Sequence, residues 1–276
     1  MTQRHDLHTH TWHSDGTLSP AELVTRAHRQ GVDVLAVTDH DVTEGVAPAR
    51  AAAAPLAMTL IAGVEVSVTW QGQTLHIVGL NINPEHEALQ SGLQRLRQHR
   101  TGRAQEIGRR LERKRITGAY EGARRIARGA IVSRMHFARF MVEQGFTANV
   151  RQAFKRYLAD GGPAYVPGRW ADLSEAVDWI RNAGGLAVLA HPARYKLNRE
   201  NLHRLLGEFS DAGGAALEVV SGCHSSPEVE RFGALAGQYR LLASTGSDYH
   251  GPEQSWIELG RGPTLPAGCT PVWQAW

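Results

Sequence analysis

Histidine and carboxylate side chains recur in this sequence at the points where buried strands are expected to end. The chain has 276 residues and 14 histidines, and nine positions follow the pattern: His8, His10, Asp15, His40, Glu65, His76, His191, Asp248 and His250. Imidazole and carboxylate together suit divalent metal ions, and one catalytic ion takes about three or four protein ligands. The nine predict two or three ions, with Mn²⁺ expected, Fe²⁺, Zn²⁺ or Mg²⁺ as alternatives, and Glu65 as a bridge.

Such a centre suits the hydrolysis of a phosphate ester. A water that bridges two ions can attack as hydroxide, because a bound metal lowers the pKa of water from about 15.7 to as low as about 7. We predict that Glu65, Asp248 and His224 are catalytic, with His224 binding phosphate or protonating the leaving oxygen. Since arginine binds phosphate bidentately, the predicted substrate-binding residues are Arg134, Arg194, His224, Asp15 and His40. Asp39 is expected to orient His40.

Strand and helix signals alternate along the chain and would position these residues. Strands are expected at residues 4–10, 33–38, 58–66, 74–80, 186–190, 215–220 and 241–245. Capping-box patterns at Ser19–Glu22 and Asp172–Glu175 predict helix starts, and further helices are expected at 44–54, 201–212 and 227–239. Repeated strand–helix units predict a parallel sheet closed into an α/β barrel, whose functional residues lie at the carboxyl ends of the strands.

The stretch from about residue 85 to residue 157 has a different pattern. It is helical and charged, with breaks expected at Gly102, Gly118, Gly122 and Gly145. Residues 95–169 hold 18 of the 30 basic residues and five of the 27 acidic ones, a net charge of +13, which leaves −10 for the rest. A basic face attracts polyanions. We therefore predict a barrel formed by residues 1–94 and 170–276, with residues 95–169 inserted as a basic helical substrate lid.

Composition excludes several classes of protein. A hydrophobic content of 42% is too high for a disordered chain. No apolar run approaches the roughly 18 residues of a membrane span, and the first residues do not resemble a signal peptide. Cys223 and Cys269 form no metal or redox motif and indicate a reducing compartment. We expect a cytoplasmic protein with no membrane partner and no evident protein partner.

These residues also carry a family resemblance. The segments 6–10 (DLHTH), 14–16 (SDG), 38–40 (TDH), 63–65 (GVE), 76–79 (HIVG), 190–192 (AHP) and 247–250 (SDYH) resemble the motif set of the PHP (polymerase and histidinol phosphatase) superfamily. The resemblance implies an α/β fold, a distorted (β/α)7 TIM-like barrel with an inserted helical subdomain and a trinuclear metal centre. It assigns one ion to His8, His10, Glu65 and Asp248, a second to Glu65, His76 and His191, and a third to Asp15, His40 and His250.

Within the superfamily, the inserted segment is similar to one branch. Residues 133–139 (SRMHFAR) resemble its Arg-Pro-His-Ile-Ala element, with Met135 in place of proline, and residues 162–167 (GPAYVP) match its next stretch. That branch contains 3′,5′-nucleoside bisphosphate phosphatases and RNase AM-type 5′-to-3′ exoribonucleases. The resemblance implies a phosphoric monoester hydrolase that removes the 3′-phosphate of nucleoside 3′,5′-bisphosphates and, secondarily, acts on nucleoside monophosphates. The insertion does not match the histidinol phosphatases.

Three other functions remain as alternatives. The first is a 5′-to-3′ exoribonuclease acting on short 5′-phosphorylated RNA, for which a basic insertion is natural. A metal-dependent amidohydrolase is disfavoured, because such binuclear sites often use a bridging carboxylated lysine and the lysines here, Lys114, Lys155 and Lys196, fall at no central strand end. The third is a non-catalytic nucleic-acid-binding module. The expected partner is a nucleotide or a short oligonucleotide.

Overall fold

The computed structural model describes residues 3–276 and contains one seven-stranded sheet in sequence order. The strands are β1 (His5–Asp6), β2 (Val34–Val37), β3 (Thr59–Trp70), β4 (Gln73–Leu80), β5 (Leu186–Leu189), β6 (Ala216–Ser221) and β7 (Leu242–Gly246). The first and last strands approach each other, since the Leu7 amide donates to the Thr245 carbonyl at 3.0 Å and the Asp248 amide to the His8 carbonyl at 2.8 Å. The sheet is therefore a nearly closed barrel, and the predicted α/β barrel class is confirmed.

The expected all-parallel pairing is wrong at β4. This strand is antiparallel to both β3 and β5, whereas the other neighbours are parallel. The cause is the turn between β3 and β4, where Gln71 and Gly72 both have positive φ angles, 47° and 76°. Two such residues form the tight turn that suits a hairpin. A hairpin forces antiparallel pairing, which runs without a break from Gly63↔Leu80 to Trp70↔Gln73.

The first strand is also shorter than expected. Its ladder with β2 contains only His5↔Val34 and Asp6↔Leu35. Beyond Asp6 the backbone turns toward β7, as the bonds of Leu7 and His8 to the other end of the sheet show. The residues that carry His8 and His10 therefore lie at the seam where the barrel closes.

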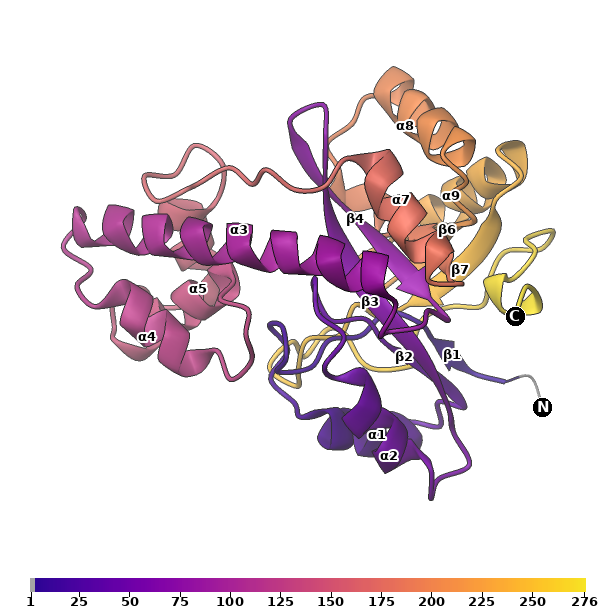
Figure 1. Cartoon of the computed structure of the whole chain (residues 1–276), viewed down its shortest axis with the longest axis horizontal. Helices are drawn as coiled ribbons and strands as arrows, with labels where there is room; N and C mark the ends of the chain where they lie inside the picture. The colour runs from indigo at the N-terminus through magenta and orange to yellow at the C-terminus, as the bar shows by residue number, and fades with distance from the viewer. Residues whose placement is uncertain (1–2) are drawn as a thin grey trace.

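Helices cover the outside of the barrel (Figure 1). They are α1 (Pro20–Arg29), α2 (Val46–Ala53), α7 (Leu173–Asn182), α8 (Arg199–Asp211) and α9 (Ser226–Gln238). The predicted capping boxes at Ser19 and Asp172 are confirmed, with both reciprocal hydrogen bonds present. Helices α7, α8 and α9 each bury an apolar face in the largest core cluster, against strands β3 to β7. In the described residues no helix is long and apolar enough to cross a membrane.

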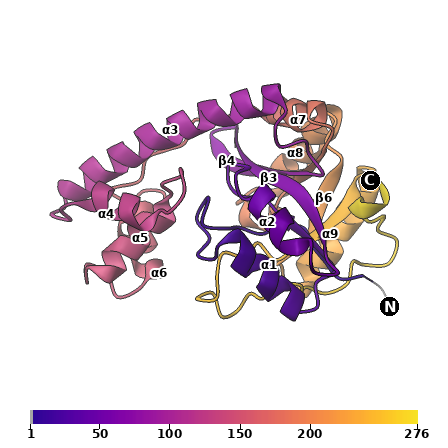
Figure 2. The same ribbon diagram turned by 60° about the horizontal axis from the view of Figure 1, so that its bottom comes forward.

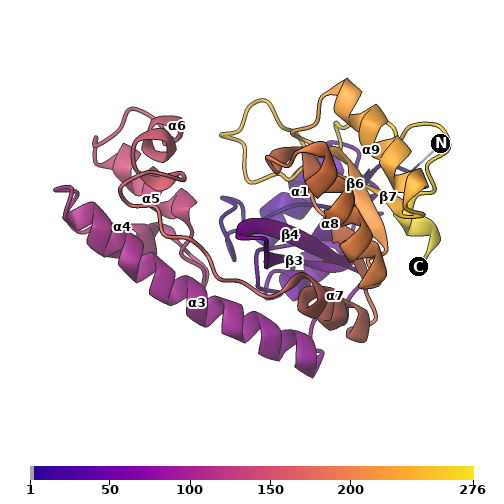
Figure 3. The same cartoon turned by 90° about the horizontal axis from the view of Figure 1, so that it is seen from above.

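Residues 87–158, called the helical segment below, extend to one side of the barrel. They form α3 (Glu87–Glu112), α4 (Ala119–Ile126), α5 (Arg134–Glu143), α6 (Val150–Ala153) and a π-helical turn at Phe154–Leu158. Helix α3 leaves the barrel and carries α4 to α6 at its far end (Figures 2 and 3). That end has a hydrophobic cluster of its own, which includes Ile107, Leu111, Phe137 and Met141.

Two of the expected glycine breaks in this segment are wrong. Gly118 and Gly145 do adopt left-handed backbone at helix ends, but Gly102 lies inside α3 and Gly122 inside α4. An interior glycine costs a helix only about 1 kcal/mol, which packing can offset. At Gly122 the missing side chain leaves room for the ring of Phe140, because a Cβ there would lie 2.1 Å from it.

Two glycines of α3 provide a test of how this helix is held to the barrel. A Cβ at Gly92 would lie 2.6 Å from the Trp179 ring of α7, whereas nothing lies within 4 Å of a Cβ at Gly102. We expect Gly92→Ala to lower the free energy of unfolding by about 1–3 kcal/mol through overpacking. The matched Gly102→Ala should raise it by up to about 1 kcal/mol. Urea unfolding of both variants measures this, and shifts of the same sign would contradict the proposed contact.

Candidate metal centre

All nine side chains predicted as ligands meet at one mouth of the barrel. They come from the ends of β1, β2, β5 and β7, from β3 and β4, and from the loop after β1. Their ligand atoms form four overlapping groups, each with atoms within 4.8 Å of one another: His10, Asp15, His40 and His250; His8, Glu65 and His191; His8, His10 and Asp248; and His40, Glu65 and His76. No further residue of the described chain joins these groups.

The carboxylate of Glu65 is the centre of this cluster. It is fully buried on β3. Five imidazoles approach it: His40 at 2.7 Å, His76 at 2.8 Å, His191 at 3.0 Å, and His8 and His10 at 3.3 Å. Burial by itself would raise the pKa of Glu65, but the neighbouring histidines, His40 and His76 foremost, hold it well below its usual range. The ionised carboxylate can therefore serve as a bridging ligand.

The chemistry and hydrogen bonding of the cluster fit divalent ions. His8 Nε2, Asp15 Oδ1 and Glu65 Oε2 are buried and have no hydrogen-bond partner, although other ligand atoms lie within 4 Å. An unpaired buried polar group costs about 1–3 kcal/mol, so this arrangement suits ions better than hydrogen bonds. Burial lowers the pKa of His76 to about 4 and that of His10 to about 3, whereas nearby carboxylates outweigh burial and raise the pKa values of His8, His40 and His250. Neutral imidazole and ionised carboxylate are the forms that bind metals.

The geometric groups differ in part from the predicted ion sets. Asp15, His40 and His250 do lie together, with His10 as a fourth member. Glu65, His76 and His191 do not form a single group, because His76 joins Glu65 with His40 and His191 joins it with His8. The assignment of residues to individual ions, and the number of ions, remain predictions.

Two of the ligand positions have strained backbone. His191 and Asp248 have φ angles of 27° and 55°, a region that non-glycine residues rarely adopt and that costs about 1–3 kcal/mol. Hydrogen bonds hold both, since the His191 amide donates to Glu218 and the Asp248 amide to the His8 carbonyl. Both residues contribute ligand atoms to the cluster in this backbone conformation.

Glu218 is a site residue that the sequence analysis missed. It is buried on β6, where one carboxylate oxygen lies 3.0 Å from His8 Nδ1 and the other accepts from the His191 amide. Donation from His8 Nδ1–H would fix the tautomer that leaves Nε2 free as a ligand. An acidic residue inside the apolar run Ala216–Val220 was the available signal, because a buried carboxylate needs polar partners.

The predicted contact between Asp39 and His40 is wrong. Asp39 accepts from the Thr11 amide at 2.7 Å, the Thr11 hydroxyl at 2.6 Å and the Ser14 hydroxyl at 2.6 Å. It therefore fixes the loop that carries Asp15, and His40 is oriented by Glu65 instead.

Two of the predicted substrate residues border the cluster. The Arg194 guanidinium lies 2.6 Å from Asp248 Oδ2. The His224 ring pairs through Nδ1 with the Val219 carbonyl at 2.9 Å, so Nδ1 carries the proton, and its buried Nε2 has no partner. Burial lowers the pKa of His224. The neutral ring therefore presents an acceptor, and not a proton donor, at Nε2.

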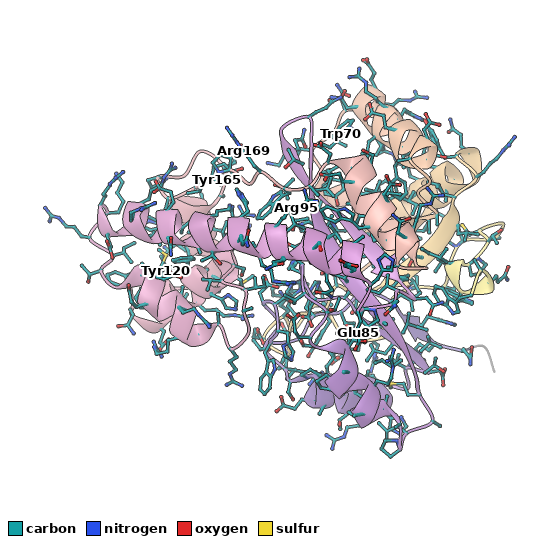
Figure 4. The ribbon with its side chains drawn as sticks, viewed as in Figure 1. Trp70, Glu85, Arg95, Tyr120, Tyr165 and Arg169 are labelled. Atoms are coloured by element: carbon teal, nitrogen blue, oxygen red, sulfur yellow. The ribbon has the colours of Figure 1, made fainter. Side chains whose placement is uncertain are left out.

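Arg134 lies on α5 beside a second arginine, Arg103 of α3, which the sequence analysis did not single out. Arg134 stacks on Phe154 and Tyr165 at 5.7 and 6.0 Å, and Arg103 Nε donates to the Val166 carbonyl at 2.8 Å. Figure 4 shows Tyr165 on the stretch that returns along α3 to the barrel. Burial, followed by the charges of Arg134 and of Arg100 on α3, lowers the pKa of Arg103 to about 9.

These two arginines have no acidic partner. Within residues 3–276 no carboxylate lies within 4.0 Å of either guanidinium, whereas Arg100 pairs with Asp41 at 2.6 Å. Two partly buried cations that repel each other favour a bound anion. The charge of Asp15 acts on Arg134, which indicates that this arginine lies on the side of the metal cluster.

Comparisons with known proteins agree with this geometry. The PHP domain family matches residues 6–181. The chain is 48% identical over 275 residues to the "5'-3' exoribonuclease Rnm" of Escherichia coli (strain K12), covering 99% of this chain and 93% of that protein. It is 44% identical over 270 residues to the "3',5'-nucleoside bisphosphate phosphatase" of Chromobacterium violaceum, covering 98% and 95%. A solved amidohydrolase structure from C. violaceum, with bound sulfate and no metal, has a TM-score of 0.95 at 44% identity and covers 99% of this chain and 95% of that one.

Glu218 provides a test of the cluster as a metal site. We expect Glu218→Gln to weaken Mn²⁺ retention about 10- to 100-fold, because the charged partner of His8 is lost while the side chain keeps its size. Competition against a chelator, with metal content measured after desalting, gives the apparent Kd. The control is Glu230→Gln, an exposed position on α9. Equal retention by both variants would exclude a positioning role for Glu218.

Proposed function

Because this chain belongs to the PHP domain family, we propose that it is a metal-dependent phosphoesterase that removes the 3′-phosphate of nucleoside 3′,5′-bisphosphates. One observation carries the choice of substrate. The cluster for divalent ions and the two neighbouring arginines without an acidic partner, Arg103 and Arg134, are two separate sites for negative charge. A substrate with two phosphates can occupy both. A relative 44% identical carries the same activity in its name.

Each part of the site has a proposed role. The nine clustered side chains would hold two or three ions, with Mn²⁺ expected from the mixed imidazole and carboxylate donors. Bound divalent ions supply a nucleophilic water of lowered pKa and neutralise charge on the phosphoryl oxygens. Arg194, fixed beside Asp248, would contact the reacting phosphate, and His224 Nε2 would accept a hydrogen bond from the substrate.

The second phosphate would lie against the helical segment. Arg103 and Arg134 would bind the 5′-phosphate by charge-assisted hydrogen bonds. Residues 95–169 would then act as a substrate lid over a barrel formed by the rest of the chain. The substrate class and the free cysteines, Cys223 and Cys269, favour a cytoplasmic location.

A second candidate function is a 5′-to-3′ exoribonuclease acting on short 5′-phosphorylated RNA. Two observations favour it: a relative 48% identical carries that name, and residues 95–169 have a net charge of +13. The two functions share one site, because both need a bound 5′-phosphate and a phosphate ester at the metals. Substrate length separates them.

The direct experiment measures product release with Mn²⁺ from adenosine 3′,5′-bisphosphate, adenosine 5′-monophosphate and 5′-phosphorylated oligoribonucleotides. We expect the bisphosphate to be turned over and Asp248→Ala to lower kcat/KM by about 10³-fold or more. Asp178→Ala, an exposed change on α7, should leave the activity unchanged. No phosphate release from the bisphosphate by the metal-loaded protein would refute the proposed function.

Arg134 provides a test of the second phosphate site. Loss of a charge-assisted hydrogen bond costs about 1.5–3 kcal/mol, so Arg134→Ala should raise KM for the bisphosphate about tenfold or more with little change in kcat. The KM for adenosine 3′-monophosphate, which lacks the 5′-phosphate, should not change. The control is Arg125→Ala, an exposed arginine of α4 paired with Glu143. If KM for both substrates stays at the wild-type value, Arg134 does not contact the substrate.

A further inference from the structure

One large apolar side chain is exposed in the loop that follows the last ligand of the metal cluster. Trp256 is 76% exposed, and the other exposed large hydrophobic of residues 3–276, Trp276, is 38% exposed. Trp256 lies in the loop of residues 251–258, called the rim loop below, which directly follows His250 of the metal cluster. An aromatic ring left in water beside an active site is a candidate contact for substrate.

The rim loop is fixed at both ends. At its start, Glu253 accepts from the Thr17 hydroxyl at 3.0 Å and from Arg139 of α5 at 2.9 Å. At its end, Glu258 accepts from Arg26 of α1 at 3.0 Å, and Ile257 is buried. Both carboxylates are thus neutralised by arginine. The backbone that carries Trp256 is held in place, so little ordering entropy would be lost on binding.

The rim loop contacts both the barrel and the helical segment. Ile257 approaches Gly222, 3.3 Å from where a Cβ of that residue would lie, and Gly222 belongs to the turn that carries His224. The other side reaches α5 through Arg139. Two views show this loop, the golden one after β7, projecting from the barrel toward α6 (Figures 2 and 3). The rim loop that carries Trp256 therefore has one contact with the turn before α9 and another with α5 of the helical segment.

A second tryptophan near the mouth makes a useful contrast. The ring of Trp12, in the loop between His10 and Asp15, carries the guanidinium of Arg128 at 5.2 Å. One face of the Trp12 ring is thus already occupied by the Arg128 guanidinium. Trp256 has no such partner among the aromatic and cation–π contacts of the described residues, and its ring is free to stack.

We propose that Trp256 stacks on a base of single-stranded RNA on the 3′ side of the nucleotide held at the metals. Base–aromatic stacking contributes about 1–3 kcal/mol per base and tolerates any sequence. The basic helical segment on the facing side attracts the phosphate backbone. The inference rests on the proposed phosphoesterase function and adds a contact that only a substrate longer than one nucleotide can use.

The experiment compares substrate lengths with Trp256→Ala. We expect KM for 5′-phosphorylated RNA of three to five nucleotides to rise about fivefold or more, which corresponds to the lower end of stacking energies. The KM for adenosine 3′,5′-bisphosphate should stay unchanged. Trp256→Phe should restore most of the RNA affinity, because a smaller ring still stacks. Trp276→Ala is the matched control and should leave both values unchanged.

Each other outcome overturns the inference. An equal rise of KM for both substrates would mean that Trp256 contacts the nucleotide itself or holds the rim loop, and unchanged values for both would exclude substrate contact. If the wild-type protein hydrolyses the bisphosphate but not RNA, the stacking proposal fails while the proposed function stands. If it hydrolyses neither, the proposed function fails as well.

Discussion

A buried carboxylate surrounded by five imidazoles is the interaction on which the structure of this protein depends. Glu65 is fully buried at the mouth of a barrel of apolar strands, where an isolated charge would be costly. The cost is tolerated because side chains from the other six strands or their following loops converge there as partners and as ligands. Glu218, Asp39 and the strained backbone of His191 and Asp248 are the means by which that convergence is held.

The charges of the helical segment are opposite in sign to those of the barrel mouth. The barrel side supplies carboxylates that need cations, and the helical segment supplies Arg103 and Arg134, which need an anion. A phosphorylated substrate completes both when its phosphates lie between metals and arginines. The pairing of Arg139 with Glu253 ties the two parts together at the rim. The basic helical segment therefore has a fixed position beside the barrel mouth, which suits it to bind a defined phosphate group as well as to attract polyanions in general.

Several features of the fold were predictable because their signals are local. The capping boxes at Ser19 and Asp172 depend on residues within one helical turn. The direction of β4 and the early end of β1 were not predicted. The direction of β4 follows from the short hairpin turn at Gln71 and Gly72, whereas the early end of β1 depends on pairing between distant segments, the chain after β1 and the end of β7.

The metal-binding side chains were predictable without a structure, because strand periodicity and residue chemistry point to the same nine positions. The sequence also indicated where the positive charge lies. Three features became visible in the folded chain: the grouping of those ligands around Glu65, the support of His8 and His191 by Glu218, and the position of Arg103 beside Arg134 without an acidic partner. The reason is physical: a residue's type fixes what it can bind, but burial, pairing and strain are properties of contacts between residues far apart in the chain.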